Sequence, residues 1–232
     1  MKRLNVLYLI DKLEIAGAQR HLVALLRGID KDRFEPSVVC LMHEGPLAEE
    51  IRSLGIPVEA LHVKRIYGLS GMAGLVKLIR ILKKDRIDVV HSYLFSENIL
   101  GTVAARLAGI RMIVTGRRDT GKLREGKRRH LFLYRLTNRW VDRIVCVSEA
   151  VKRLVMEREG ASQEKLVTIP NGVQVEPLLS PEKTAELREE WGVSRGTLLV
   201  TIVANLSWIK GHDVFLKAAR IVKREIPKSV SG

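Results

Sequence analysis

The sequence predicts an α/β protein with a doubly wound parallel sheet, followed by an incomplete second Rossmann-like domain. Two observations carry this prediction. Short strand-like runs alternate with helical patterns along most of the chain, and this alternation is typical of parallel sheets covered by helices on both faces. A fresh apolar, strand-like run then begins at residues 197–204, and the chain ends shortly afterwards at Gly232.

The elements follow from local pattern. Each expected strand is a short apolar run rich in β-branched residues, and these runs cover residues 4–10, 36–42, 58–63, 88–91, 112–115, 143–147 and 166–169. Each expected helix has apolar residues spaced three and four apart, and these patterns cover residues 18–28, 46–54, 71–84, 96–108, 127–140 and 149–159. Gly28, Gly55, Gly109 and Gly160 follow four of these helices, where glycine readily forms a left-handed C-terminal cap.

Length and composition indicate a soluble globular protein. The chain has 232 residues, 46% hydrophobic and 28% charged, enough for one full domain and part of another. Its longest apolar stretches are far shorter than the roughly 20 residues of a membrane-spanning helix. The N-terminus lacks a small-residue cleavage site, so we expect a buried first strand rather than a signal peptide. Cys40 and Cys146 lie inside strand-like runs, which indicates a reducing cytoplasm without disulfides.

The net charge of +14 is concentrated in one segment. Residues 111–143 contain eleven Lys and Arg against three acidic residues. Such a segment can be an ordinary solvated surface. Nucleic-acid binding is disfavoured, because interleaved aromatic residues for base stacking are missing. Residues 127–136 mix cations with large apolar side chains, which favours an anionic membrane surface and a peripheral position on the cytoplasmic membrane face.

Ligands of doubly wound folds bind beyond the carboxyl ends of the strands. The loops expected there are residues 11–17, 91–97, 116–126 and 148–149. In the first loop, Ala16 and Gly17 allow close approach to the backbone, and the N–H groups of the next helical turn suit a phosphate or another anion. Simple packing is the alternative for this turn. The nicotinamide fingerprint, the GKS or GKT phosphate loop and the GxSxG nucleophile elbow are missing from the sequence.

Five motifs occur in a fixed order along the chain. They are AGAQR at 16–20, DVVHS at 88–92, IVCVSEAV at 144–151, IPNGV at 169–173 and KGHDVFLKAA at 210–219. Together they resemble the family-4 (group 1) glycosyltransferases. The resemblance implies a GT-B fold, in which two Rossmann-like domains bind the acceptor and a nucleotide-sugar donor. It further implies sugar transfer with retention of configuration, without a cofactor or bound metal.

On this resemblance, residues 1–172 form the acceptor-side domain, residues 173–196 a linker and helix, and residues 197–232 the start of the nucleotide-sugar domain. The donor phosphates are assigned to Gly17, Asn205, Lys210 and Gly211. Lys210 matches a lysine that meets the donor diphosphate, where a cation stabilises the leaving group. Asn205 stands where the family usually has an arginine, and Ser207 supplies no cation either.

On the acceptor side, the candidate catalytic residues are His91, Arg117 and Asp119. Arg117 occupies a position where many relatives have a histidine, and a guanidinium cannot act as a general base. We therefore expect the donor phosphate to accept the acceptor's proton. Arg117 and Arg118, together with Ala16, form the expected anion-binding group, and this favours a phosphate-bearing or lipid-pyrophosphate acceptor held by bidentate contacts.

Three further residues have structural interpretations. A hydrogen-bonded structural histidine is the alternative for His91. Ser148 is expected to cap the helix that follows it. The turn Pro170-Asn171-Gly172 is expected to form the interdomain hinge, because glycine tolerates unusual backbone angles.

The resemblance also predicts which donor-binding residues an active enzyme needs. In the family, two glutamates spaced eight apart hold the ribose and the transferred sugar, well downstream of the Lys-Gly element. This chain ends before such a segment, so we expect it to be inactive alone and its last segment to be partly disordered or packed on the first domain. The alternative function is a non-catalytic acceptor- or membrane-binding module. The expected partners are a nucleotide-sugar donor, a glycan or lipid-linked acceptor of the cell envelope, and an anionic membrane.

Overall fold

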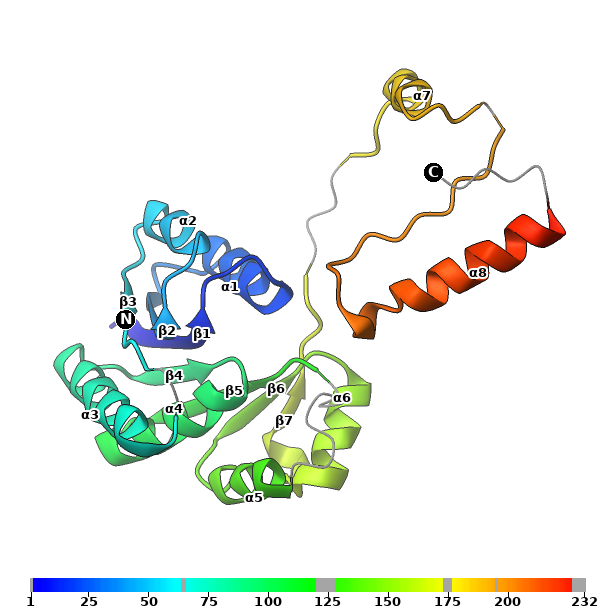
Figure 1. Cartoon of the computed structure of the whole chain (residues 1–232). Helices are drawn as coiled ribbons and strands as arrows, with labels where there is room; N and C mark the ends of the chain where they lie inside the picture. Colours follow the sequence, from blue (N-terminus) through cyan, green and yellow to red (C-terminus); the bar gives the residue numbers. More distant parts are fainter. Residues whose placement is uncertain (1, 64–65, 120–127, 173–176, 195, 227–232) are drawn as a thin grey trace. The chain divides into compact units, whose positions relative to one another are not determined.

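A parallel sheet organises the first part of the chain (Figure 1). The computed structural model describes residues 2–63, 66–119, 128–172, 177–194 and 196–226. The chain divides into two units, Met1–Val173 and Gln174–Gly232. In the first unit, seven strands lie in the order β3-β2-β1-β4-β5-β6-β7, and every neighbouring pair is parallel. The predicted fold class is confirmed.

The strands follow the expected runs closely. They are β1 (Leu4–Lys12), β2 (Phe34–His43), β3 (Val58–Ala60), β4 (Val89–Ser92), β5 (Met112–Arg117), β6 (Arg143–Cys146) and β7 (Leu166–Thr168). Strand β3 is shorter than predicted: its regular pairing with β2 ends at Ala60, although the N–H groups of Leu61 and Val63 still donate to the Cys40 and Leu41 carbonyl oxygens. Strand β5 is longer than predicted, because pairing with β6 extends it to Arg117.

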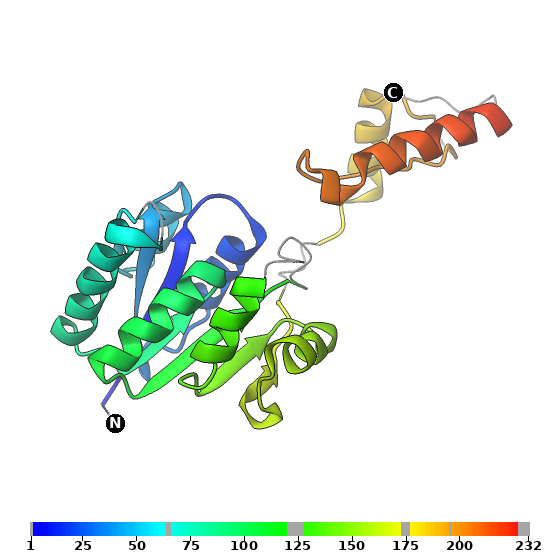
Figure 2. The same ribbon diagram turned by 60° about the horizontal axis from the view of Figure 1, so that its bottom comes forward.

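Helices connect the strands and cover both faces of the sheet (Figure 2). They are α1 (Gly17–Arg27), α2 (Leu47–Ser53), α3 (Gly68–Lys84), α4 (Phe95–Ala108), α5 (Arg128–Thr137) and α6 (Glu149–Leu154). One prediction is wrong in detail: the helix expected at 149–159 changes at Val155 into a π-helical turn, Val155–Glu159, which we call η2. The helix expected at 127–140 ends at Thr137, and its residue 127 lies outside the described residues.

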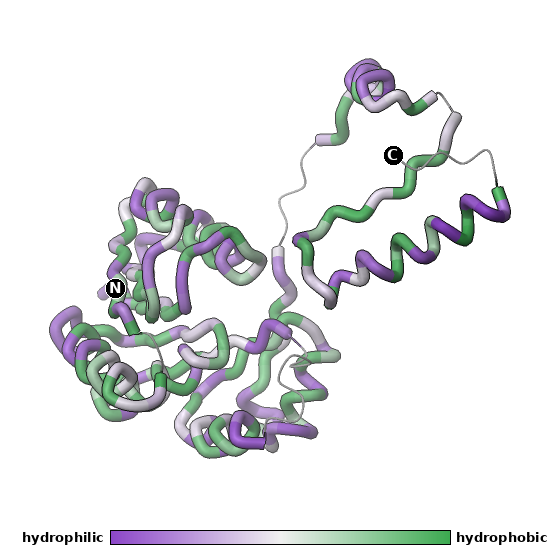
Figure 3. The backbone as a smooth tube through the Cα atoms, in the orientation of Figure 1, coloured by the Kyte–Doolittle hydropathy of each residue, from purple (hydrophilic) through white to green (hydrophobic). Residues whose placement is uncertain are grey.

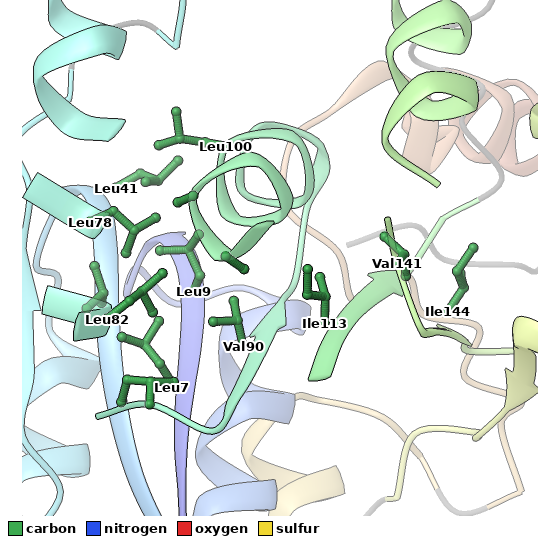
Figure 4. Packing of buried hydrophobic residues seen from close by; sticks show 14 of the residues in the cluster. Leu7, Leu9, Leu41, Leu78, Leu82, Val90, Leu100, Ile113, Val141 and Ile144 are labelled. Carbon is green, nitrogen blue, oxygen red and sulfur yellow. The ribbon is translucent and has the colours of Figure 1, made fainter. Parts of the chain in front are cut away.

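The side chains of β1 alternate between two hydrophobic clusters. Leu7 and Leu9 point into one hydrophobic cluster, which α3 and α4 cover, and Figure 4 shows them packed with Leu78, Leu82 and Val90. Val6, Tyr8 and Ile10 point into the other cluster, which α1 and α2 cover. Because successive strand residues face opposite sides, one strand supplies both cores. This buries β1, an interior strand of the sheet, on both faces, as a doubly wound sheet requires.

Three of the four predicted glycine caps are confirmed. Gly55, Gly109 and Gly160 have φ of 76°, 77° and 62°, in the left-handed region. Gly28 is the exception, because its φ is −96° and the end of α1 needs no left-handed residue. Ser148 caps α6 as predicted, since its Oγ accepts a hydrogen bond from the Val151 N–H at 3.2 Å.

The second unit contains two helices in its described part. Helices α7 (Pro181–Glu190) and α8 (His212–Glu225) are joined through a 3₁₀ turn, η4 (Trp208–Lys210). In Figure 3, hydrophobic and hydrophilic stretches alternate along α8. The strand predicted at 197–204 is not formed, because a strand needs a neighbour for its backbone hydrogen bonds and none pairs with it in the described part of this unit. None of the described residues of this unit is buried.

Candidate functional site

The carboxyl ends of β1, β4 and β5 bring the predicted acceptor-side residues together. In register, Leu9 pairs with Ser92 and Ser92 pairs with Thr115. The residues that follow these strands therefore leave the sheet at one edge. Tyr93 follows β4 in this way, and Arg118 follows β5.

A layer of aromatic and imidazole rings lines this edge. Ring centroids lie 5.5 Å apart for Tyr8 and His91, 5.1 Å for His91 and Tyr93, and 5.9 Å for Tyr93 and His21. Burial lowers the pKa of His91 to about 3, with a further contribution from Arg118. A base this weak is far from the pKa near neutrality that general-base catalysis needs. His91 therefore stays neutral within the ring layer.

Arg118 places a positive charge at the carboxyl ends of β4 and β5. Its guanidinium carbon lies 4.5 Å from the Tyr93 ring centroid, Nη2 donates to His21 Nδ1 at 2.7 Å, and Nη1 donates to Asn171 Oδ1 at 2.9 Å. Its Nε is buried without a hydrogen-bond partner among the described residues. No carboxylate forms a salt bridge with Arg118 in the part of the chain that the structure describes. Half-burial without a counter-charge lowers its pKa, and this charge is what an anionic ligand would meet.

His21 completes this arrangement, and the sequence pattern did not single it out. It lies on α1, 97 residues before Arg118 in the chain. Burial and the Arg118 charge lower the pKa of His21 to about 4, so the ring is neutral near pH 7 and its Nδ1 can accept from the guanidinium. Only the fold brings the two residues together.

Arg117 has a different role from the one predicted. It is 5% exposed, and its Nε and Nη2 donate to the carboxylate of Glu159 at 2.9–3.1 Å. Nη2 also donates to Asn138 Oδ1 at 2.9 Å, and the guanidinium carbon lies 3.9 Å from the Tyr134 ring centroid. The expected arginine pair is thus divided: Arg117 is engaged inside the protein, whereas Arg118 faces the site.

Glu159 is the last residue of the π-helical turn η2. Such single turns are rare and frequently lie at functional sites. Gly160 ends the turn in the left-handed conformation, with φ of 62°. Glu159 is 8% exposed and also accepts from Asn138 Nδ2 at 3.1 Å, so its carboxylate is held from two sides. The turn therefore joins α6 to the end of β5.

A cavity of about 500 Å³ opens beside Arg118. Its walls come from the start of α4, from α5, and from α6 with η2. The lining residues are Tyr93, Leu94, Phe95, Gly116, Arg117, Arg118, Asp119, His130, Leu131, Tyr134, Arg135, Val151, Leu154, Val155, Glu157, Arg158 and Glu159. The exposed Asp119 is among them, so the carboxylate predicted after Arg118 lies at the cavity.

Ala16 is the N-cap of α1, and Gly17 is the first residue of that helix. Ala16 is extended and the helix has no side-chain cap, so the first N–H groups of α1 have no side-chain acceptor. A Cβ placed on Gly17 would meet nothing within 4 Å, and its φ is not in the left-handed region. Packing therefore gives no reason for glycine here. Close approach of a ligand to this turn remains a prediction.

The second unit carries the other predicted phosphate residues. Lys210 ends η4 and Gly211, with φ of 71°, starts α8. His212 Nε2 contacts the Asn205 carbonyl oxygen at 2.9 Å, which fixes the turn between them. Lys210 is exposed, directly before the N-terminus of a helix. The contact of Lys210 with a donor diphosphate stays a prediction.

No group of three or more His, Cys, Asp or Glu side chains among the described residues is placed to hold a metal ion. None of the helices formed by those residues is long and apolar enough to pass through a bilayer. The basic loop residues Lys122, Arg124 and Lys127 lie outside the described part, as do residues 173–176 of the expected linker.

The known proteins that this chain resembles in sequence are glycosyltransferases. The family model "Glycosyltransferase Family 4" matches residues 15–177. The chain is 26% identical over 227 residues to the UDP-Gal:alpha-D-GlcNAc-diphosphoundecaprenol alpha-1,3-galactosyltransferase of Escherichia coli, covering 93% of this chain and 58% of that protein. It is 24% identical over 151 residues to the D-inositol 3-phosphate glycosyltransferase of Pseudarthrobacter chlorophenolicus, covering 61% of this chain and 36% of that protein.

Solved structures share the fold. A glycosyltransferase from Rickettsia africae superimposes with a TM-score of 0.74 at 17% identity, covering 97% of this chain and 59% of that one. Anabaena Alr3699/HepE in complex with UDP-glucose superimposes with a TM-score of 0.64 at 19% identity, covering 82% and 50%. The chain thus spans 36–59% of the length of these four relatives.

The Arg117–Glu159 contact generates a stability prediction. The Glu159→Ala variant leaves a buried guanidinium without its counter-charge, and we expect the free energy of unfolding to fall by about 3–5 kcal/mol. Urea denaturation followed by circular dichroism measures this loss. The control is Glu157→Ala, an exposed carboxylate in the same turn, which should change stability by about 0.5 kcal/mol or less. Equal losses in both variants would contradict the assignment.

The environment of His21 generates a pH prediction. In an NMR titration, the His21 imidazole should titrate near pH 4 rather than near 6.5, because burial and Arg118 oppose its protonation. The unfolded chain takes up this proton from about pH 6.5 downward and the folded chain only near pH 4. Stability contributed by His21 is therefore present above pH 6.5 and lost as the pH falls to 4. Arg118→Gln should raise the pKa, and an unchanged value would argue against the contact.

Proposed function

The chain belongs to glycosyltransferase family 4, and from this premise we propose that it forms the acceptor-binding half, and the beginning of the donor-binding half, of a retaining glycosyltransferase. The proposed donor is a nucleotide sugar. The proposed acceptor carries a phosphate or diphosphate and a lipid. Among the curated relatives, one name contains a diphosphoundecaprenol-linked GlcNAc and another an inositol phosphate, which supports a phosphate-bearing acceptor.

Arg118 is the observation that carries this proposal. Its neighbours His21, Tyr93 and Asn171 hold the guanidinium in place but bring no negative charge. A half-buried charge without a counter-charge is costly, and a bound phosphate would supply one. A guanidinium presents donors in a fixed fork that matches phosphate oxygens. The acceptor's phosphate would therefore bind at the carboxyl ends of β4 and β5.

The donor side of the proposal rests on two turns. The uncapped N-terminus of α1 at Gly17 offers backbone N–H groups to a phosphate, and Lys210 offers a cation before α8. Positive side-chain charge would stabilise the departing diphosphate, so we propose transfer without a metal cofactor. His91 is too weak a base to accept the acceptor's proton. The donor phosphate is the proposed proton acceptor.

Peripheral membrane binding is part of this proposal. On α5, Arg128 and Arg129 are exposed, and Phe132 is 65% exposed. Cations beside an exposed aromatic ring suit the surface of an anionic bilayer.

The proposed membrane binding of α5 is tested with vesicles that contain an anionic phospholipid. Reversing the charge of Arg128 and Arg129 to Glu should weaken co-sedimentation on the order of tenfold or more, at about 1 kcal/mol per basic residue. The same charge change at Arg80 and Lys84 on α3 is the control and should have little effect. If both double variants bind alike, α5 is not the membrane surface.

The proposed binding of the acceptor's phosphate at Arg118 is tested by calorimetry with inorganic pyrophosphate. Arg118→Gln should weaken binding on the order of ten- to a hundredfold, because charge-assisted hydrogen bonds contribute about 1.5–3 kcal/mol. Arg111→Gln is the control, since Arg111 is exposed just before β5 at the other edge of the sheet. Unchanged affinity in Arg118→Gln would refute the proposed acceptor site.

A second titration on the same protein distinguishes the two function classes. A panel of UDP- and GDP-sugars is added, and transfer to a lipid-diphosphate sugar is measured. Donor binding with transfer supports the enzyme. Pyrophosphate binding without any response to donors supports a non-catalytic acceptor-binding module.

A further inference from the structure

The cavity beside Arg118 changes character with depth. Its buried lining is largely apolar or aromatic, and half-buried leucines from three elements complete the wall. These residues are Tyr93, Phe95, Tyr134, Val151 and Val155, with Leu94, Leu131 and Leu154. Charged side chains stand mainly at its exposed edge, where Arg135 and Arg158 lie with Asp119 and Glu157. A ligand that fits this cavity therefore has an apolar segment.

Two buried charges in the lining, those of Arg117 and Glu159, already have their partners. Arg117 and Glu159 neutralise each other, Asn138 bonds to both, and the Tyr134 ring covers the guanidinium. Sugar hydroxyls placed here would lose their hydrogen bonds to water and find few groups to replace them, which costs free energy for each buried hydroxyl. A hydrocarbon chain has no such requirement.

The walls are held in place before any ligand binds. The Phe95 ring packs against the His130 ring at an interplanar angle of 33°, with centroids 4.2 Å apart, and meets Tyr134 edge-on at 5.1 Å. The Asn98 side chain donates to the Gly116 carbonyl oxygen at 2.8 Å, which ties the first turn of α4 to the end of β5. A preformed apolar cavity binds its ligand without paying for its own ordering.

We propose that this cavity binds the hydrocarbon of the acceptor lipid next to its phosphate, in the form of an isoprenoid segment. The inference rests on the proposed function, since Arg118 must hold the phosphate at the cavity. Arg118 lines the cavity, so a ligand held by this guanidinium has its next atoms at the apolar walls. Charge and apolar surface are thus adjacent, as they are in a lipid diphosphate.

The test is a chain-length series measured by calorimetry on the full chain. The probes are inorganic pyrophosphate and the dimethylallyl, geranyl and farnesyl diphosphates. Burial of one methylene strengthens binding about fourfold, so affinity should rise about tenfold or more with the first added isoprene units. A sugar 1-phosphate is the comparison probe and should bind no tighter than pyrophosphate.

Substitutions in the cavity walls test whether the gain in affinity with chain length arises in this cavity. Leu154→Asn and Leu131→Asn place a polar side chain of similar size in the walls formed by α6 and α5, and they should abolish most of the chain-length gain while pyrophosphate affinity stays the same. Leu107→Asn is the matched control, because Leu107 is 60% exposed on α4 and does not line the cavity. Circular dichroism confirms that each variant folds.

The outcomes separate the two proposals. Failure of pyrophosphate to bind refutes the acceptor site at Arg118. Pyrophosphate binding without a gain from chain length, or a gain that survives both wall variants, refutes the hydrocarbon cavity alone. Tighter binding of the sugar 1-phosphate than of the prenyl diphosphates assigns the cavity to the sugar instead. If the wall variants do not fold, photo-crosslinking of the wild type with a diazirine-bearing prenyl diphosphate must label the start of α4, α5, α6 or η2, and labelling elsewhere overturns the inference.

Discussion

Arg117 lies buried at the end of β5, and its charge has to be met inside the protein. Glu159 meets it from the end of η2, 42 residues later in the chain, and Asn138 meets it from the turn after α5. Removing a charge from water is costly unless it is paired and hydrogen-bonded, so these segments must converge on one point. The π-helical turn that carries Glu159 and the position of α5 follow from this requirement.

Two successive arginines therefore do different work. Side chains of neighbouring residues in a strand point to opposite faces, and at the end of β5 one guanidinium enters the interior while the next stays at the edge. Arg117 fixes the strand end, and Arg118 is held at that edge by uncharged groups. One arginine has its counter-charge within the fold, whereas the other is left to find one in a ligand.

The sequence was sufficient for the sheet and most helices, because alternation of strand and helix patterns depends on local composition. It also predicted the Ser148 cap and three glycine caps, which depend on neighbouring residues alone. The contacts of Arg117 with Glu159 and of Arg118 with His21 could not be predicted, since they join residues 42 and 97 positions apart. The strand expected at 197–204 failed for a related reason: an apolar run specifies a strand only where a partner strand exists.

The order of the sheet has a consequence for synthesis. Of the seven strands β1 is made first, yet it lies in the interior of the sheet and pairs with β4 as well as β2. The backbone N–H of Asn5 is bonded to a carboxylate oxygen of Asp88, 83 residues later. At about 5–20 residues per second, a ribosome needs several seconds to supply that partner. During this time the apolar strand Leu4–Lys12 has one edge unpaired, so the newly made chain depends on protection of that edge until β4 arrives.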